Sequence, residues 1–192
     1  MRLYLLAGLI LHKLVWEVLK RQPGSAPRQR STARVRIVKL VKIAILVRIA
    51  VQTAVPAVLP IHDMPEVLTI LGVLLYSAGL WLTIAGRIQL GRNWSDIEAG
   101  TVQTNHEVVS TGVYGFIRHP IYTGDLALLF GLELALGSWL VLLVPLLVPI
   151  VLRKAATEER KLLTTIQGYG QYCERTNRFL PFPSRVFSRS SR

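Results

Sequence analysis

Long apolar runs dominate the chain, and they predict helices that cross a membrane. Residues 67–86 are 20 consecutive positions without a charge, about the length of helix that crosses the core of a bilayer. Residues 43–61 carry a single charge, Arg48, and predict a second span. Because proline cannot continue a helix, Pro56 and Pro60 are expected to end or bend this span near its far side.

A weaker apolar run lies at residues 3–19. His12, Lys13 and Glu17 interrupt it, so its pattern is compatible with a short span, an interfacial helix or a signal-type segment. We assign no role to His12 from the sequence.

The apolar region at residues 126–152 is too long for one span. It has 27 positions with Glu133 as its one charge, and a single helix of that length would measure about 40 Å at 1.5 Å per residue. Two spans, at about 121–136 and 139–156, joined by a tight turn at Gly137-Ser138, account for it better. Within the second span, Pro145 and Pro149 are expected to produce a kink.

Charge decides the topology of these spans. The segment 20–42 carries eight Lys and Arg residues and the segment 153–192 carries nine, whereas the opposite connections near 62–63 and 137–138 carry none. Positive charge concentrates on the cytoplasmic side of membrane proteins. We therefore predict an all-α polytopic membrane protein of about five transmembrane helices, with a C-terminal helical hairpin and the functional site on the cytoplasmic side.

Composition agrees with this prediction. The 192 residues are 51% apolar and 18% charged, with a net charge of +12, which is unlike a soluble domain. A nucleic-acid-binding function is disfavoured, because no recognised binding motif accompanies the basic residues. Cys173 is the single cysteine, so the chain forms no internal disulfide.

Reactive side chains concentrate around the loop 87–120. Tyr114, Arg118, His119 and Tyr122 lie close together in the sequence. The carboxylates Glu158-Glu159 follow the last predicted span. If the hairpin doubles back, both groups lie at the same side of the membrane and can share a pocket.

These residues resemble a known signature. The stretch Gly112-Val-Tyr-Gly-Phe-Ile-Arg-His-Pro-Ile-Tyr-Thr-Gly124 is similar to the G-x-Y-x-x-x-R-H-P-x-Y-x-G pattern of the isoprenylcysteine carboxyl methyltransferase family, whose wider superfamily includes phospholipid methyltransferases. Three further elements occur in order: Leu90-Gly-Arg-Asn-Trp-Ser95 upstream, the glutamate pair, and Gly168-Tyr-Gly-Gln-Tyr172 followed by Arg178-Phe-Leu-Pro181. The resemblance covers roughly residues 65–183.

The resemblance implies an integral-membrane enzyme that uses S-adenosyl-L-methionine and a lipophilic methyl acceptor from the bilayer. It implies cofactor binding by Glu158 or Glu159 and by two upstream groups: His106, Glu107, Val108 and Val109, then Tyr114, His119, Pro120, Ile121 and Tyr122. Arg118 is assigned to the catalytic group. The family often has an acceptor-orienting arginine one turn before the glutamate; here the choice is Arg153 or Lys154, and Lys154 has the better spacing.

We divide the chain into N-terminal helices with a basic linker (1–64), a methyltransferase core (65–183) and a basic tail (184–192). The favoured activity resembles isoprenylcysteine carboxyl O-methylation. Methylation of a phospholipid amine or a small thiol, and a non-catalytic module that binds lipid or a partner, are the alternatives. Glu133 and Asp125 are charges inside a predicted span, where such groups usually face a cavity. Glu133 is compatible with lining an acceptor tunnel or with a structural role.

Overall fold

A computed structural model describes residues 1–20, 40, 44, 47–54, 59–91 and 107–181. Its main helices are α1 (Arg2–Lys20), α3 (Glu66–Leu90), α4 (Pro120–Ala135) and α5 (Val148–Thr165). Shorter elements are the 3-10 helices η3 (Gly112–Gly115) and η4 (Trp139–Leu147) and the helix α6 (Tyr169–Arg175). The described part contains helices and no named strand, in agreement with the predicted all-α class.

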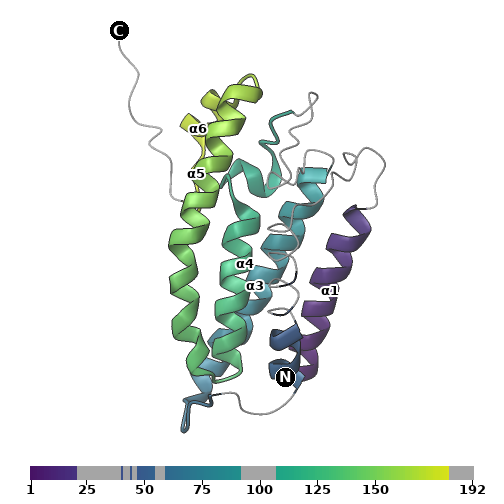
Figure 1. Ribbon diagram of the computed structural model, residues 1–192, viewed down its shortest axis with the longest axis vertical. Helices are drawn as coiled ribbons and strands as arrows, with labels where there is room; N and C mark the ends of the chain where they lie inside the picture. Colours follow the sequence, from purple (N-terminus) through teal and green to yellow (C-terminus); the bar gives the residue numbers. More distant parts are fainter. Residues whose placement is uncertain (21–39, 41–43, 45–46, 55–58, 92–106, 182–192) are drawn as a thin grey trace.

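The long helices lie side by side, with α6 at one end of the bundle and the turn between α4 and η4 at the other (Figure 1). Two segments, Glu66–Leu90 and Trp139–Thr165, are long and apolar enough to cross a membrane. Of the predicted span at 43–61, residues 47–54 are helical. The remaining described helices do not establish the predicted number of five spans.

Glycines set the contact between α3 and α4. Gly72 and Gly79 on α3 lie against the backbone of Ala135 and Leu128 on α4. A methyl group on Gly79 would lie 2.7 Å from the carbonyl oxygen of Gly124. Membrane helices use such small residues to bring their backbones close together. The seven-residue spacing of these two glycines did not enter the prediction from the sequence.

The predicted C-terminal hairpin is present. α4 ends at Ala135, Gly137 adopts a positive φ of 61° in the turn, and η4 begins at Trp139. The loop before α3 fastens this turn, since the amide of Ile61 donates to the carbonyl of Gly137 at 2.7 Å. The chain therefore reverses direction, as the length of the apolar region predicted.

The two prolines act differently from the predicted kink in an α-helix. Pro145 lies inside the 3-10 helix η4, and Pro149 lies in the first turn of α5. Proline is tolerated in a first turn because its missing N–H has no partner there. The second arm of the hairpin therefore changes from 3-10 to α geometry between the prolines.

Glu133 is buried at the turn end of the bundle. Its carboxylate accepts a hydrogen bond from Gln52 Nε2 at 2.7 Å, and Gln52 Nε2 also lies 3.3 Å from Ser138 Oγ. Along α4, Glu133 lies near the C-terminal end and His119 precedes the N-terminal end. This position supports the structural alternative for Glu133.

Candidate functional site

The site is built where α4 begins. His119 precedes Pro120, the first residue of α4, and the segment after α6 runs alongside it. The amide of Arg118 donates to the carbonyl of Asn177 at 2.8 Å, and the amide of His119 donates to that of Arg178 at 3.1 Å. These bonds bring two segments that are distant in the sequence into contact and fix the direction of their side chains.

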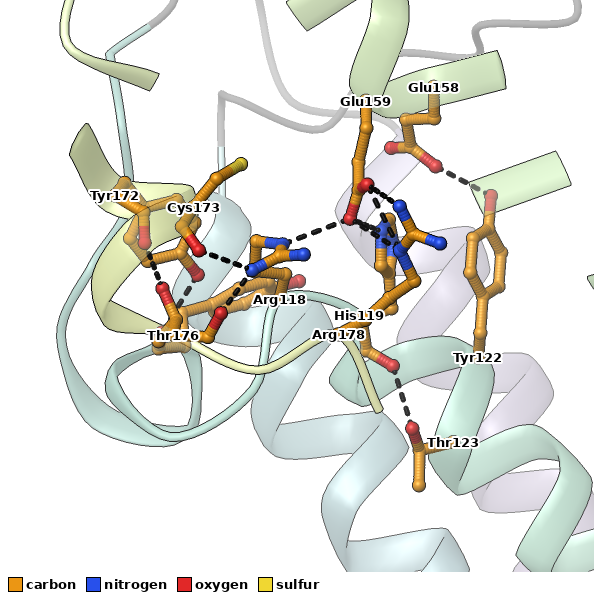
Figure 2. Close-up of polar contacts among 11 residues, drawn as sticks. Arg118, His119, Tyr122, Thr123, Glu158, Glu159, Tyr172, Cys173, Thr176 and Arg178 are labelled. Carbon is orange, nitrogen blue, oxygen red and sulfur yellow. Dashed lines mark hydrogen bonds and ion pairs between the residues drawn. The ribbon is translucent and has the colours of Figure 1, made fainter. Parts of the chain in front are cut away.

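Glu159 is the centre of a buried charge cluster (Figure 2). Its residue is 5% exposed, and its Oε1 accepts from Arg118 Nε at 2.9 Å and lies 3.0 Å from His119 Nε2. Arg178 donates to both oxygens, from Nε at 3.1 and 3.0 Å and from Nη2 as well. The carboxylate thus joins α5, the start of α4 and the segment after α6. These four residues are called the Glu159 cluster below.

Arg118 is engaged within the protein. Besides Glu159, its Nη1 donates to the carbonyls of Cys173, at 2.9 Å, and Thr176. The hydrogen bonds to the Glu159 carboxylate raise the pKa of Arg178 above its usual value. Through its bonds to the carbonyls of Cys173 and Thr176, Arg118 holds the end of α6 in place. Its role toward a cofactor stays a prediction.

Glu158 has a different environment from its neighbour. It is partly exposed, and its Oε2 accepts a hydrogen bond from the Tyr122 hydroxyl at 2.8 Å. The ammonium of Lys154 lies 5.5 Å from the centre of the Tyr122 ring, within the range of a cation–π contact. Glu158, Tyr122 and Lys154 form a second polar group, here called the Tyr122 group, beside the Glu159 cluster.

Aromatic faces line this part of the site. The His119 ring stacks on Tyr122 with centroids 5.4 Å apart and on Phe179 with centroids 5.5 Å apart. Apolar faces beside a carboxylate suit a ligand that joins a ring system to a charged end.

Tyr114 lies deeper in the same end of the bundle. Its carbonyl accepts a hydrogen bond from the Tyr172 hydroxyl at 2.8 Å. Burial raises the pKa of Tyr114 above its usual value and that of Tyr172 to about 12. Both phenols are therefore neutral at physiological pH. The amide of Val113 donates to Gln89 Oε1 at 2.9 Å, which fastens this loop to α3.

The remaining predicted residues are distributed as follows. Pro120 and Ile121 pack against Gly86 of α3. Arg153 is exposed on α5, and Lys154, not Arg153, lies over the Tyr122 ring. The residues Glu107, Val108 and Val109 precede η3 and are exposed or partly exposed.

Several predictions concern positions that the structure does not describe. His106, most of the basic linker, residues 92–95 of the upstream motif and the tail 184–192 lie outside the described residues. Their predicted roles remain predictions.

Arg178 and Phe179 were not assigned to the site from the sequence. Both belong to the Arg178-Phe-Leu-Pro181 element, which is part of the resemblance but carries no assigned role. The position of this element after the glutamate pair and the Gly168–Tyr172 element was the one sequence signal that could have pointed to a role in the site. The contact between Arg178 and Glu159 is visible only in the folded structure.

Comparison with known proteins identifies the chain's family. The sequence pattern of the family described as phospholipid methyltransferase matches residues 67–171. The chain belongs to the phospholipid methyltransferase family. The match begins in α3 and ends in α6, so it includes the whole of the Glu159 cluster except Arg178.

Two curated relatives are similar to this phospholipid methyltransferase family member. One is a protein-S-isoprenylcysteine O-methyltransferase of Schizosaccharomyces pombe, 28% identical over 106 residues, which are 54% of this chain and 45% of the relative. The other is the cobalt-zinc-cadmium resistance protein CzcN of Cupriavidus metallidurans, 33% identical over 97 residues, 48% of this chain and 43% of the relative. The chain thus spans less than half the length of each.

Proposed function

We propose that this protein is an integral-membrane methyltransferase that uses S-adenosyl-L-methionine and methylates a lipophilic acceptor, with a carboxylate as in isoprenylcysteine as the favoured methyl-accepting group. The family membership and the similarity to an isoprenylcysteine O-methyltransferase support this proposal. The observation that carries it is the meeting of the His119 segment and the glutamate pair at one end of the bundle.

The residues present fit this cofactor. S-adenosyl-L-methionine supplies an electrophilic methyl group on a sulfonium, and it also carries an amine, a carboxylate and an adenine. Glu158 is the glutamate that we assign to the amine, because Glu159 is buried and accepts from three side chains. The Glu158 carboxylate is partly exposed and accepts from the Tyr122 hydroxyl at Oε2. A carboxylate has about four acceptor positions, so this one retains room for an ammonium.

Arg178 is the candidate for the cofactor's carboxylate. Its side chain is 42% exposed, and among the described residues its bonds to Glu159 use Nε and Nη2. The fork geometry of the guanidinium leaves Nη1 directed away from that pair. The rings of Tyr122 and Phe179, which both stack on His119, offer apolar surface for the adenine.

Lys154 is the candidate for the acceptor. Its position over Tyr122 places a positive charge beside Glu158, one helical turn earlier on α5. An acceptor carboxylate is attracted to such a point charge. Transfer then depends mainly on alignment of the acceptor with the methyl group and on removal of both from water, and no base is required for an acceptor that is already ionised.

We further propose that the site faces the cytoplasm, because the basic segments lie on its side of the predicted topology. A phospholipid amine is the second candidate acceptor, favoured by the description of the matching family.

The test is equilibrium binding of S-adenosylhomocysteine to the detergent-solubilised protein by calorimetry. Glu158→Gln should weaken binding by about tenfold or more, because the hydrogen bond from the ligand's ammonium would then end on a neutral amide instead of a carboxylate. Thr157→Ala, at the exposed neighbouring position, is the matched control and should bind normally. Absence of saturable binding to the unmodified protein would overturn the proposed function.

Turnover with three acceptors then identifies the substrate class. A farnesylated cysteine, phosphatidylethanolamine and a small thiol are each supplied with labelled cofactor. Methylation of the farnesylated cysteine alone supports the favoured acceptor, and methylation of phosphatidylethanolamine alone supports the second candidate. Binding of the cofactor without turnover of any of them would contradict both.

A further inference from the structure

The Glu159 cluster and the Tyr122 group form one closed ring of contacts (Figure 2). Glu159 Oε1 lies 3.0 Å from His119 Nε2, and the His119 ring stacks on Tyr122. The Tyr122 hydroxyl donates to Glu158 Oε2 at 2.8 Å, and Glu158 is the chain neighbour of Glu159, which closes the ring. The carboxylate assigned to the cofactor's amine and the carboxylate that holds Arg178 therefore belong to the same small site.

Two arginines share the single carboxylate of Glu159. Arg118 Nε donates to its Oε1 at 2.9 Å, and Arg178 Nε donates to its Oε2 at 3.0 Å. Without counting the histidine, the cluster therefore has one positive charge in excess. The Arg118 side chain is mostly buried and donates from Nη1 to two backbone carbonyls, whereas the Arg178 side chain is 42% exposed. The excess charge is thus accessible to a ligand at Arg178.

Arg178 is held at both ends. Its backbone carbonyl accepts a hydrogen bond from the amide of His119 at 3.1 Å. Its guanidinium donates to Glu159 from Nε and Nη2, and such a two-point contact fixes the plane of the fork. An arginine side chain without this contact would sample many rotamers. Glu159 removes that freedom before a ligand arrives, and it leaves Nη1 directed away from its own carboxylate.

We propose that Glu159 is a positioning residue that makes the site specific for a methyl donor with a carboxylate. It holds the Arg178 guanidinium so that Nη1 donates to the carboxylate of S-adenosyl-L-methionine, and it does not itself touch the cofactor. This inference rests on the proposed function. It gives the two neighbouring glutamates different roles, because Glu158 contacts the cofactor directly and Glu159 acts through Arg178.

The proposed role predicts that the site distinguishes the cofactor from its decarboxylated form. A decarboxylated ligand keeps the adenine, the sulfur and the amine, so it loses only the contact with Arg178. A hydrogen bond between charged groups changes affinity by about tenfold or more. When Glu159 is absent, the carboxylate-bearing ligand must also immobilise the Arg178 side chain, and this lowers its affinity alone.

The experiment compares S-adenosylhomocysteine with its decarboxylated analogue, S-adenosyl-3-thiopropylamine, in calorimetric binding to the full chain in detergent. The unmodified protein should bind S-adenosylhomocysteine more tightly by about tenfold or more. Arg178→Gln should remove this preference, and Glu159→Gln should reduce it by about fivefold. Glu174→Gln is the matched control, the same exchange at an exposed position of α6, and should leave both affinities unchanged.

Three further variants show whether Glu159 acts through Arg178. In the Arg178→Gln background, adding Glu159→Gln should change the preference no further, because the two residues are coupled. Arg178→Lys keeps the positive charge but lacks the fork, so it should also reduce the preference. Glu158→Gln should weaken both ligands alike, since both carry the amine, and should keep the preference.

The outcomes separate this inference from the proposed function. An unchanged or larger preference in Glu159→Gln overturns the positioning role, because Glu159 would then only neutralise Arg178. Equal weakening of both ligands in a folded Glu159→Gln protein overturns it as well. If that variant does not fold, Arg178→Lys decides, and a normal preference there refutes the role of the fork. Equal binding of both ligands by the unmodified protein also refutes it, whereas absence of saturable binding contradicts the proposed function itself.

Discussion

Replacing Glu159 by glutamine should destabilise the site end of the bundle more than the same replacement of Glu158. The exchange keeps the size of the side chain but removes its charge, and the new amide would present N–H groups to Arg118, His119 or Arg178. The side chains of Arg118 and His119 are 11% and 5% exposed. Water therefore cannot replace the hydrogen bonds that they lose with the carboxylate.

The magnitude follows from these environments. Removing one partner of a buried ion pair typically costs about 3–5 kcal/mol. Arg118 keeps the carbonyls of Cys173 and Thr176 as acceptors. Arg178 is 42% exposed and regains solvation, so its contribution is small. We expect the free energy of unfolding to fall by about 3 kcal/mol, at the lower end of this range.

The assay is reversible unfolding of purified protein in mixed micelles, followed by circular dichroism. Glu158→Gln is the matched control and should cost about 1 kcal/mol or less, because Glu158 is partly exposed and its contact with Tyr122 is a single hydrogen bond. Amide hydrogen exchange at Arg118 and His119 should accelerate in the Glu159 variant, since their partners lie in the segment that Arg178 anchors. Equal losses of stability in the two variants would refute this reasoning.

Two further exchanges test the packing and the phenol network. Gly79→Val should prevent normal docking of α3 on α4, because its Cβ would overlap the backbone of Leu128. Ala78→Val, at an exposed neighbouring position, is the control and should leave docking unchanged. Native-like thermal stability of both variants would contradict the close approach of the two helices. Tyr172→Phe should lose about 1 kcal/mol of stability with its hydrogen bond to the Tyr114 carbonyl. In the unmodified protein, the Tyr172 phenol should ionise only near pH 12, because burial raises its pKa. An exposed tyrosine ionises at about pH 10. A rise in phenolate absorbance near that pH that disappears in Tyr172→Phe would therefore contradict the burial of Tyr172.

The long elements followed from the sequence by itself. An uncharged run of 20 residues specifies α3, because only a helix satisfies its own backbone in an apolar surrounding. The 27-residue run with Gly137-Ser138 at its middle specifies a hairpin, because a single helix would exceed the bilayer. The concentration of reactive side chains and the resemblance to a methyltransferase signature pointed to His119, Tyr122 and the glutamate pair, and the predicted hairpin placed them on one side.

Tertiary structure decided which of the two glutamates is buried and which is partly exposed. Glu158 and Glu159 are chemically identical neighbours, and a helix turns successive side chains by about 100°. That rotation directs Glu159 into a buried contact with Arg118, His119 and Arg178 and leaves Glu158 beside Tyr122.

Tertiary structure also decided which side chains from distant segments of the sequence form pairs. His12 meets Asp125 across 113 residues and Arg178 meets Glu159 across 19, and no periodicity in the sequence records such pairs. The sequence determined which segments form helices and at which end the reactive residues gather. The packing of those helices decided which charges face each other, because that depends on helix rotation and close approach, which are set at glycines such as Gly79.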